Sequence, residues 1–250
     1  MSAAWEAKMA SKRADLHLVE RNFFKSRAKA QEAIAAGLVR VDGKLLCKAS
    51  DAIDPNAEIE ARAPYPWVSR GGVKLAAALD AFGFDPQGRA CLDIGASTGG
   101  FTHVLLSRGA VQVAAVDVGH GQLHPDVARD PRVASHEGTD ARRLTPAQLG
   151  TAPALVTCDV SFISLRLVLP AVLPLAAEKA SLIALVKPQF EAGPANVVKG
   201  LVKDAEVRRK ICADIEALIS DLGWRVLGVI PSPIEGGDGN REYLIGAMRP

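Results

Sequence analysis

The chain has 250 residues, 48% of which are apolar, and a formal net charge of +2 at pH 7. This length allows one domain or two, with enough apolar side chains for a buried core. A charge this small excludes a strong overall field for attracting nucleic acid, and four scattered cysteines without a C-x-x-C pair argue against a disulfide framework or a zinc site.

Neither a signal peptide nor a membrane-spanning segment is expected. The first residues lack the apolar stretch of a secretory signal, and the longest apolar run, around residues 162–177, is interrupted by Arg166 and by prolines. We therefore expect a cytoplasmic protein that has no membrane partner.

Positive charge is concentrated at the start of the chain. Residues 1–48 contain ten Lys and Arg against five Asp and Glu, a net charge of +5 for this segment. A basic module beside a nearly neutral remainder favours contact with a polyanion, although an ordinary solvated surface gives the same count.

Two short helices and a hairpin are predicted in this basic segment. Asp15 is expected to cap the first helix, and Ser26 to cap a second helix over residues 27–36. Asp42 and Gly43 lie between two alternating apolar runs, which is the strongest short-range signal for a β-hairpin.

Residues 11–62 resemble an S4 RNA-binding domain, most clearly in the hairpin sequence GLVRVDGK. Such domains bind structured RNA largely through its shape and its phosphates. The residues expected to contact RNA are basic: Arg13, Arg27, Lys29, Arg40, Lys44 and, beyond this domain, Arg70.

A stiff linker is predicted over residues 63–72, because Pro64-Tyr65-Pro66 favours extended backbone. A second domain is then expected over residues 73–250. It opens with a helix over 73–82 whose apolar positions leave Lys74 on another side.

The second domain alternates between short apolar runs and amphipathic stretches. This alternation predicts an α/β fold with a parallel, doubly wound sheet of the Rossmann type. Strands are expected over 90–94, 111–117, 133–136, 154–159, 181–186, 224–230 and 242–248, and helices over 100–107, 146–149, 165–176 and 204–222.

A glycine-rich turn joins the first of these strands to its helix. The turn and the helix start are expected to bind a ligand through Gly95, Ser97, Thr98, Gly99, Gly100 and Phe101. Glycine lets a ligand approach the backbone closely, and the free N–H groups of a helix start favour an anion. A βα turn without a ligand remains the alternative interpretation.

Two carboxylates accompany the turn. Asp93 lies at the end of the first strand, and Asp117 ends the second strand, 22 residues past Gly95, where a ribose-binding carboxylate belongs. The glycine spacing differs from G-x-G-x-x-G, which disfavours a dinucleotide. S-adenosylmethionine combines a carboxylate, a cationic centre and a ribose, and it fits this arrangement better.

The turn also matches G-x-S-x-G, the nucleophile elbow of α/β-hydrolases. That interpretation requires an acid and then a histidine later in the chain. No histidine lies beyond position 136, so a hydrolase is disfavoured.

Two further polar residues end neighbouring strands of the predicted sheet. Asp159 follows the fourth strand and Lys187 follows the fifth, so that the two side chains can reach one another beyond the carboxyl ends of the strands. A lysine beside an acid at a dry site can act as an acid or base. A solvated lysine at a strand end is the simpler alternative.

Five segments, taken in order, resemble the TlyA family, which is related to the FtsJ-type ribose methyltransferases and includes members with an old haemolysin label. They are LDIGASTGGFT, VDVGHGQL, CDVSFISL, LVKPQFEAG and GNREYL. The resemblance implies an S-adenosylmethionine-dependent methyltransferase that acts on the 2′-hydroxyl of a cytidine in ribosomal RNA, with ribosomal subunits as partners and no metal.

The resemblance also implies a catalytic tetrad of Lys74, Asp159, Lys187 and Glu242, and it adds Asp140 and Asp159 to the expected cofactor ligands. A ribose hydroxyl must lose its proton as it attacks, and a lysine whose pKa is lowered can accept that proton. Our hypothesis is that Lys187 is the base, that Lys74 and Asp159 tune it and position the hydroxyl, and that Glu242 supports the lysines.

Two other functions remain open at this point. A non-catalytic RNA-binding factor for ribosome assembly would use the S4 unit alone, but an intact tetrad argues against it. A membrane-active haemolysin is disfavoured because the sequence offers no strongly amphipathic basic helix.

Overall fold

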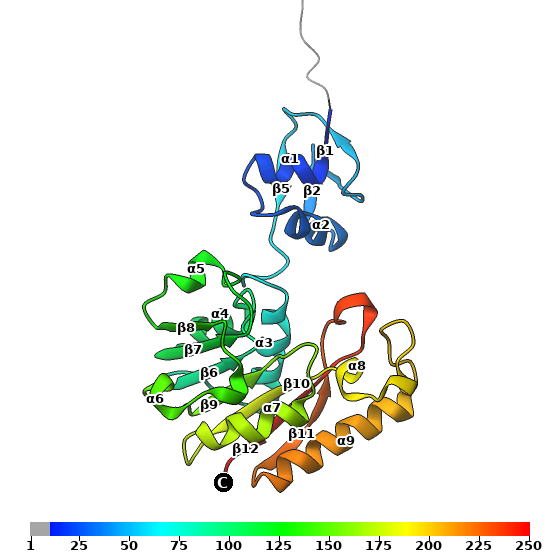
Figure 1. Ribbon diagram of the computed structural model, residues 1–250. Helices are drawn as coiled ribbons and strands as arrows, with labels where there is room; N and C mark the ends of the chain where they lie inside the picture. The colour runs from blue at the N-terminus through cyan, green and yellow to red at the C-terminus, as the bar shows by residue number, and fades with distance from the viewer. Residues whose placement is uncertain (1–10) are drawn as a thin grey trace, which may run out of the picture. The chain divides into compact units, whose positions relative to one another are not determined.

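The computed structural model in Figure 1 describes residues 11–250, apart from the side chain of Asp238. The chain divides into two compact units at the boundary between Pro66 and Trp67. We describe each unit by itself.

The N-terminal unit is a small α+β domain with its own core. Helices α1 (Ala14–Glu20) and α2 (Arg27–Ala35) pack against each other. Two antiparallel sheets accompany them, one of β1 (Lys12–Arg13) and β4 (Ala52–Ile53), the other of β2 (Val39–Val41), β3 (Lys44–Leu45) and β5 (Ile59–Ala61). The buried core includes Leu18, Phe24, Ala30, Ile34 and Val39.

The local signals in this unit were read correctly with one exception. Ser26 caps α2 by accepting a hydrogen bond from the Lys29 N–H, and Asp42 and Gly43 turn the hairpin with φ of 49° and 74°. The prediction that Asp15 caps α1 was wrong. Asp15 is the second residue of that helix and is buried, because basic side chains compete for its carboxylate.

The C-terminal unit is built on a seven-stranded sheet with the order β11-β12-β10-β9-β6-β7-β8. Its strands are β6 (Ala90–Ile94), β7 (Gln112–Asp117), β8 (Val133–Glu137), β9 (Leu155–Cys158), β10 (Ser181–Val186), β11 (Arg225–Pro231) and β12 (Tyr243–Met248). The strands from β8 to β10 pair in parallel, which confirms the predicted doubly wound α/β fold.

The last strand, β12, departs from the parallel direction that the βα alternation predicts for the rest of the sheet. β12 runs antiparallel to both of its neighbours, β10 and β11. A parallel connection needs a crossover of a dozen or more residues, usually a helix. Only residues 232–242 connect β11 to β12, so the chain turns back on itself.

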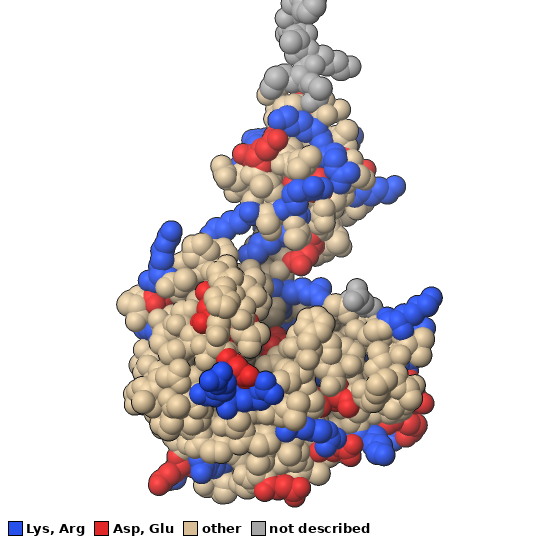
Figure 2. All heavy atoms as spheres, in the orientation of Figure 1, with Lys and Arg blue, Asp and Glu red and all other residues tan. Residues whose placement is uncertain are grey.

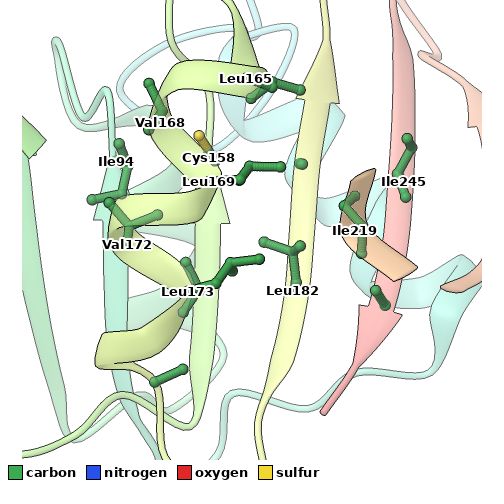
Figure 3. Packing of buried hydrophobic residues seen from close by; sticks show 14 of the residues in the cluster. Ile94, Cys158, Leu165, Val168, Leu169, Val172, Leu173, Leu182, Ile219 and Ile245 are labelled. Carbon is green, nitrogen blue, oxygen red and sulfur yellow. The ribbon is translucent and has the colours of Figure 1, made fainter. Parts of the chain in front are cut away.

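Helices cover both faces of the sheet. On one face, α3 (Gly71–Phe82) and α4 (Gly100–Ser107) bury residues such as Leu75, Leu79 and Leu105. On the other face, α7 (Leu165–Val172) and α9 (Ala205–Asp221) pack Leu169 and Ile219 onto the strands (Figure 3). Shorter helices are α5 (Pro125–Ala128), α6 (Pro146–Leu149) and α8 (Pro188–Glu191).

Two helix boundaries differ from those expected. α3 begins at Gly71, inside the stretch assigned to the linker. In its first turn the Trp67 side chain packs so closely on Gly72 that a Cβ there would collide with it. The helix expected over 165–176 ends at Val172 and continues as a 3-10 turn over Leu173–Leu175. Pro174, within that turn, lacks the N–H that a continuing α-helix requires.

Within residues 11–250, no helix is both long enough and apolar enough to cross a membrane.

Candidate active site

The glycine-rich turn follows β6 and leads into the N-terminus of α4. Gly95 has a φ of 82°, and its Cα faces the backbone of Asp159 so closely that a Cβ would collide with the Asp159 carbonyl oxygen. Gly99 also has a positive φ, of 88°, and lies under Leu123. Glycine is therefore required at both positions by conformation and by space.

The carboxylate of Asp117 holds this turn in place. Its Oδ2 atom accepts a hydrogen bond from the Ser97 N–H at 2.8 Å, and its Oδ1 atom accepts one from the Gly119 N–H at 2.8 Å. Each carboxylate oxygen can accept a second hydrogen bond, so Asp117 can still bind a ligand hydroxyl.

A cavity of about 360 Å³ opens above the ends of β6, β7 and β9. Its polar wall is formed by Gly95, Ser97, Asp117, Gln122, Asp140 and Asp159, and its apolar wall by Val118, Phe162, Ile163 and Val168. A pocket of this size, mostly apolar with a few converging polar groups, is typical of a small-molecule site.

Asp140 lies on the rim of this cavity. Its carboxylate pairs with Arg142, with a shortest distance of 2.6 Å, and this neighbour lowers the pKa of Asp140 to about 2. Asp140 is therefore ionised at neutral pH and can accept hydrogen bonds from a ligand.

Asp93 lies elsewhere than we expected of a cofactor ligand. It is fully buried below the turn, and neither adjoining cavity is lined by it. The hydroxyls of Thr102 and Thr157 donate to its two oxygens at 2.7 and 2.9 Å. Asp93 thus connects α4 and β9 to β6 and supports the turn from beneath.

Burial raises the pKa of Asp93 to about 6. An unfolded chain has an aspartate pKa of about 3.9, so the folded state binds this proton more tightly. The resulting stabilisation is complete below about pH 4 and is lost as the pH rises through about 6.

Asp93→Asn is expected to remove this pH dependence. Between pH 4 and pH 6, the free energy of unfolding should shift by up to about 2–3 kcal/mol in favour of the variant relative to the natural chain. Urea unfolding across this range measures the effect, with Asp80→Asn on the exposed face of α3 as the control. Parallel pH curves for the natural chain and Asp93→Asn would contradict it.

Four ionisable residues converge beside the cavity as two ion pairs. The first joins Lys187, at the end of β10, to Asp159, at the end of β9, with 2.6 Å between Nζ and Oδ1. Lys187 also donates to the Ser161 hydroxyl at 2.8 Å. Only 11% of its side chain is exposed, so the ammonium is held in one place and largely sheltered from water.

The second pair joins Lys74, on α3, to Glu242, just before β12, with 2.5 Å between Nζ and Oε2. Both side chains are buried, with 8% and 3% exposure. Gly236 leaves room for the Glu242 carboxylate, which a side chain at that position would displace.

A second, smaller cavity brings the two pairs together. It has a volume of about 160 Å³ and is lined by Lys74 and Asp159 as well as by Ser69, Thr98, Gly100 and Phe101. It shares Gly95, Ser97 and Asp159 with the larger cavity. One small molecule in each cavity would therefore meet the other at Gly95, Ser97 and Asp159, close to Lys74 and to the Asp159–Lys187 pair.

Models of known families match both units. The FtsJ-like methyltransferase model matches residues 67–249, and the S4 domain model matches residues 12–59. The 16S/23S rRNA (cytidine-2′-O)-methyltransferase TlyA of Mycobacterium tuberculosis is 45% identical over 236 residues, which cover 93% of this chain and 88% of that protein. The chain belongs to the TlyA group of the FtsJ-like methyltransferase family.

Other TlyA-type relatives carry a haemolysin name. Hemolysin A of Brachyspira hyodysenteriae is 38% identical over 234 residues, covering 93% of this chain and 98% of that protein. A solved structure of a hemolysin from Streptococcus thermophilus covers 96% of this chain and 89% of its own, with 38% identity and a TM-score of 0.75. The two family models and the Mycobacterium tuberculosis relative confirm the recognised family, the S4 unit and a methyltransferase enzyme.

Several residues around the site of this TlyA-type chain were not predicted as site residues from the sequence. Glu137 accepts hydrogen bonds from the N–H groups of Gly121, Gln122 and Leu123 and thereby holds one wall of the larger cavity. Its position at the end of β8 repeats the pattern of an acid at a strand end, which was the available signal. Phe162 is 91% exposed, and its ring lies 5.0 Å from that of Phe190.

The hydrolase interpretation of the turn finds no support. Ser97 does have the positive φ, 46°, that a nucleophile elbow shows, but its hydroxyl contacts the side-chain oxygen of Gln122 at 3.2 Å instead of a histidine. No group of three or more His, Cys, Asp or Glu side chains in residues 11–250 is arranged to hold a metal ion.

The six residues predicted to contact RNA lie on both units. Arg13 and Arg27 pair with Asp15, Lys29 lies 6.0 Å from the centre of the Tyr65 ring, and Arg40 donates to the Gly43 carbonyl. Lys44 is exposed on the hairpin. Arg70 precedes α3 in the other unit, where it donates to the Glu235 carbonyl.

Two long connections lie near the site, residues 192–204 between α8 and α9 and residues 232–242 between β11 and β12, and a hydrogen bond joins them. Asn240 is buried and donates to the carbonyls of Gly200 and Gly237, each at 3.1 Å. Arg208, on α9, donates to the carbonyls of Val202 and Lys203. The bond from Asn240 to Gly200 connects the loop after α8 to the loop that carries Glu242, and the Arg208 bonds hold the end of the first loop against α9.

Proposed function

We propose that this protein uses S-adenosylmethionine to methylate the 2′-hydroxyl of a cytidine in ribosomal RNA. The observation that carries the proposal is the position of two lysine–carboxylate pairs, one buried and one largely sheltered from water, beside two adjoining cavities. The printed activity of the Mycobacterium tuberculosis relative supports the choice of substrate.

The larger cavity offers S-adenosylmethionine suitable contacts. Gly95 and Ser97 line one wall, Asp117 offers carboxylate oxygens to a ribose, and Val118 and Ile163 offer apolar surface to a base. Asp140 and Gln122 add polar contacts at the rim. When bound, this cofactor supplies an electrophilic methyl group.

Lys187 is the proposed general base. A ribose 2′-hydroxyl is a weak nucleophile and must lose its proton during the reaction. Lys187 can accept that proton once its own ammonium group has released a proton to solvent. Asp159 and Ser161 fix the Lys187 Nζ atom through contacts of 2.6 and 2.8 Å. A fixed base avoids the entropic cost of finding its position in each turnover.

Lys74 is proposed to position the hydroxyl oxygen. It lines the smaller cavity together with Asp159, and Glu242 holds its ammonium group there. A positive charge beside the oxygen stabilises the negative charge that develops as the proton leaves. Asp93 has no direct part in this scheme and acts by supporting the glycine turn.

Gly95→Ala is expected to weaken cofactor binding by at least about tenfold and to cost about 1–2 kcal/mol more stability than Gly88→Ala. Both glycines have a positive φ, 82° and 70°, but nothing lies within 4 Å of a Cβ at Gly88. The control therefore carries the same backbone strain without the collision. Calorimetric titration and thermal unfolding measure the two effects, and equal behaviour of the variants would contradict the close approach.

The activity itself is tested by incubating the purified chain with labelled S-adenosylmethionine and unmodified ribosomal subunits. We expect label on the ribose of a cytidine, mapped by blocked cleavage at the modified nucleotide. The absence of transfer, or transfer to a base, would overturn the proposal. RNA binding without transfer would favour a non-catalytic assembly factor, and lysis of red blood cells without transfer would favour a membrane-active haemolysin.

A further inference from the structure

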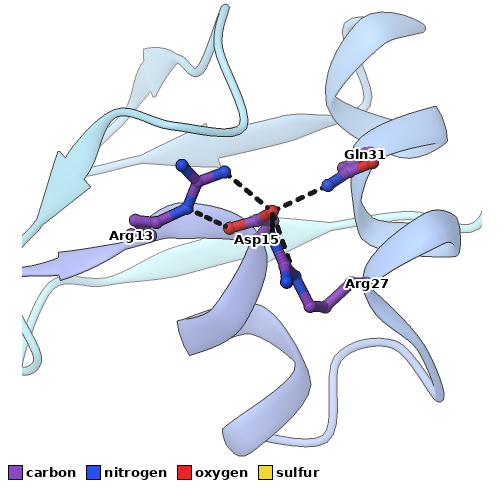
Figure 4. A network of polar contacts seen from close by, with 4 residues as sticks. All are labelled: Arg13, Asp15, Arg27 and Gln31. Atoms are coloured by element: carbon purple, nitrogen blue, oxygen red, sulfur yellow. Dashed lines mark hydrogen bonds and ion pairs between the residues drawn. The ribbon is translucent and has the colours of Figure 1, made fainter.

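Asp15 lies beneath two exposed arginines in the N-terminal unit (Figure 4). Its side chain is completely buried, whereas 49% of the Arg13 side chain and 52% of the Arg27 side chain remain exposed. Arg13 comes from β1 and Arg27 is the first residue of α2, so one carboxylate brings together basic groups from two elements.

The contacts to Asp15 fix both guanidinium planes. Arg13 approaches with two nitrogens, Nε at 3.1 Å from Oδ1 and Nη2 at 3.2 Å from Oδ2. Arg27 approaches Oδ2 with Nη2 at 2.9 Å and Nε at 3.3 Å, and the Gln31 amide donates to the same oxygen at 2.7 Å. The hydrogen bonds from Arg13 are the largest cause of a pKa for Asp15 far below its usual range.

Donors remain on both arginines. A guanidinium has five N–H groups, and each arginine directs only its Nε and Nη2 atoms toward Asp15. Within the described residues, the Nη1 groups of Arg13 and Arg27 donate no hydrogen bond. Two arginines and one carboxylate leave the cluster with a net charge of +1, at the N-terminal end of α2, where the helix also favours an anion.

Overall charge cannot explain how this unit would hold RNA. Continuing the count from residue 48 to the boundary at Pro66 adds Arg62 and four acids, Asp51, Asp54, Glu58 and Glu60, so the net charge falls from +5 to +2. Lys and Arg side chains are nevertheless prominent on the face of the unit drawn in Figure 2. The arrangement of these groups therefore matters more than their number.

We propose that Asp15 is a positioning residue that holds Arg13 and Arg27 side by side as a binding site for a phosphate of the RNA backbone. This inference rests on the proposed RNA substrate. A guanidinium offers paired donors that match phosphate oxygens, and fixing its plane in advance reduces the entropy lost on binding. Without Asp15, the two positive groups repel each other and move apart.

The direction in which RNA affinity changes when Asp15 is replaced distinguishes the positioning role from two simpler roles, net charge and stability. If only net charge mattered, Asp15→Asn would add one positive charge to the unit and tighten RNA binding. If the cluster served stability alone, a folded Asp15→Asn variant would bind RNA as the natural chain does. The positioning role predicts weaker binding despite the added charge.

The test compares full-length Asp15→Asn with Glu20→Gln for binding of an unmodified ribosomal RNA fragment over a range of salt concentrations. Glu20 is an exposed acid of α1 that pairs with Lys12, so its replacement changes the net charge by the same amount. Asp15→Asn should bind about tenfold more weakly and lose about one to two units of the salt dependence, whereas Glu20→Gln should bind as tightly or up to about threefold more tightly.

A second pair of variants covers the case in which Asp15→Asn does not fold. Arg13→Lys combined with Arg27→Lys keeps both charges and their attraction to Asp15 but removes the forked donors, so binding should fall by about tenfold. Arg62→Lys, on the same unit, should have little effect. Natural-strength binding by the double lysine variant would overturn the inference. Failure of the natural chain to bind RNA would instead count against the proposed function.

Discussion

Lys187→Ala is expected to reduce methyl transfer by about 100-fold to 10,000-fold, the range that a general base supplies. Lys187 accepts the proton from the ribose in its neutral form, after its ammonium group has released a proton to solvent, while Asp159 holds the Nζ atom at 2.6 Å. Lys187 does not line the larger cavity, so the affinity for S-adenosylmethionine should stay within about twofold of the natural value.

The matched control is Lys210→Ala, which removes an exposed lysine from α9. Single-turnover methyl transfer with saturating cofactor and RNA separates the chemical step from binding. Raising the pH should not restore the alanine variant, since it has no group left to deprotonate. Activity above about one tenth of the natural rate would remove Lys187 from the role of base.

The elements that form the site could largely be predicted because their signals are local. β6 and β10 have the predicted boundaries, since each is an apolar run that ends abruptly at a glycine or a charged residue. Parallel strands then bring their carboxyl ends to one edge of the sheet. Neighbouring places for Asp159 and Lys187 followed from that topology alone.

The pairing of Lys74 with Glu242 could not be derived from the spacing of the residues in the sequence. Lys74 and Glu242 are 168 positions apart, and they meet because β12 inserts antiparallel between β10 and β11 and so enters the sheet from the edge where the site lies. Strand direction at the end of a sheet depends on long-range pairing and on loop length, which periodicity does not report.

The roles of Asp15 and Asp93 were misjudged for a related reason. An acid near a helix start predicts a cap, and an acid at the end of a strand beside a glycine turn predicts a ligand contact. Both carboxylates are instead fully buried, one satisfied mainly by arginines and the other by threonine hydroxyls. Burial and hydrogen-bond partners come from the tertiary fold.

Breaking the Lys74–Glu242 pair is expected to have the second large effect. Glu242→Gln leaves the ammonium of Lys74 buried without its counter-ion, and removing one partner of a buried pair costs about 3–5 kcal/mol of stability. Lys74→Met, which leaves the Glu242 carboxylate buried without its counter-ion, should reduce the stability by a similar amount. The double variant, Lys74→Met with Glu242→Gln, should recover much of the loss, because neither buried charge remains.

Activity should not recover together with stability. If Lys74 positions the ribose hydroxyl, the stable double variant still lacks the positive charge in the smaller cavity and stays inactive, while its cofactor affinity remains close to natural. Urea unfolding of the four proteins gives the coupling energy between the two residues, and single-turnover methylation gives the rates. A double variant that regains both stability and methyl transfer would show that the pair holds α3 to the start of β12 and takes no part in the chemistry.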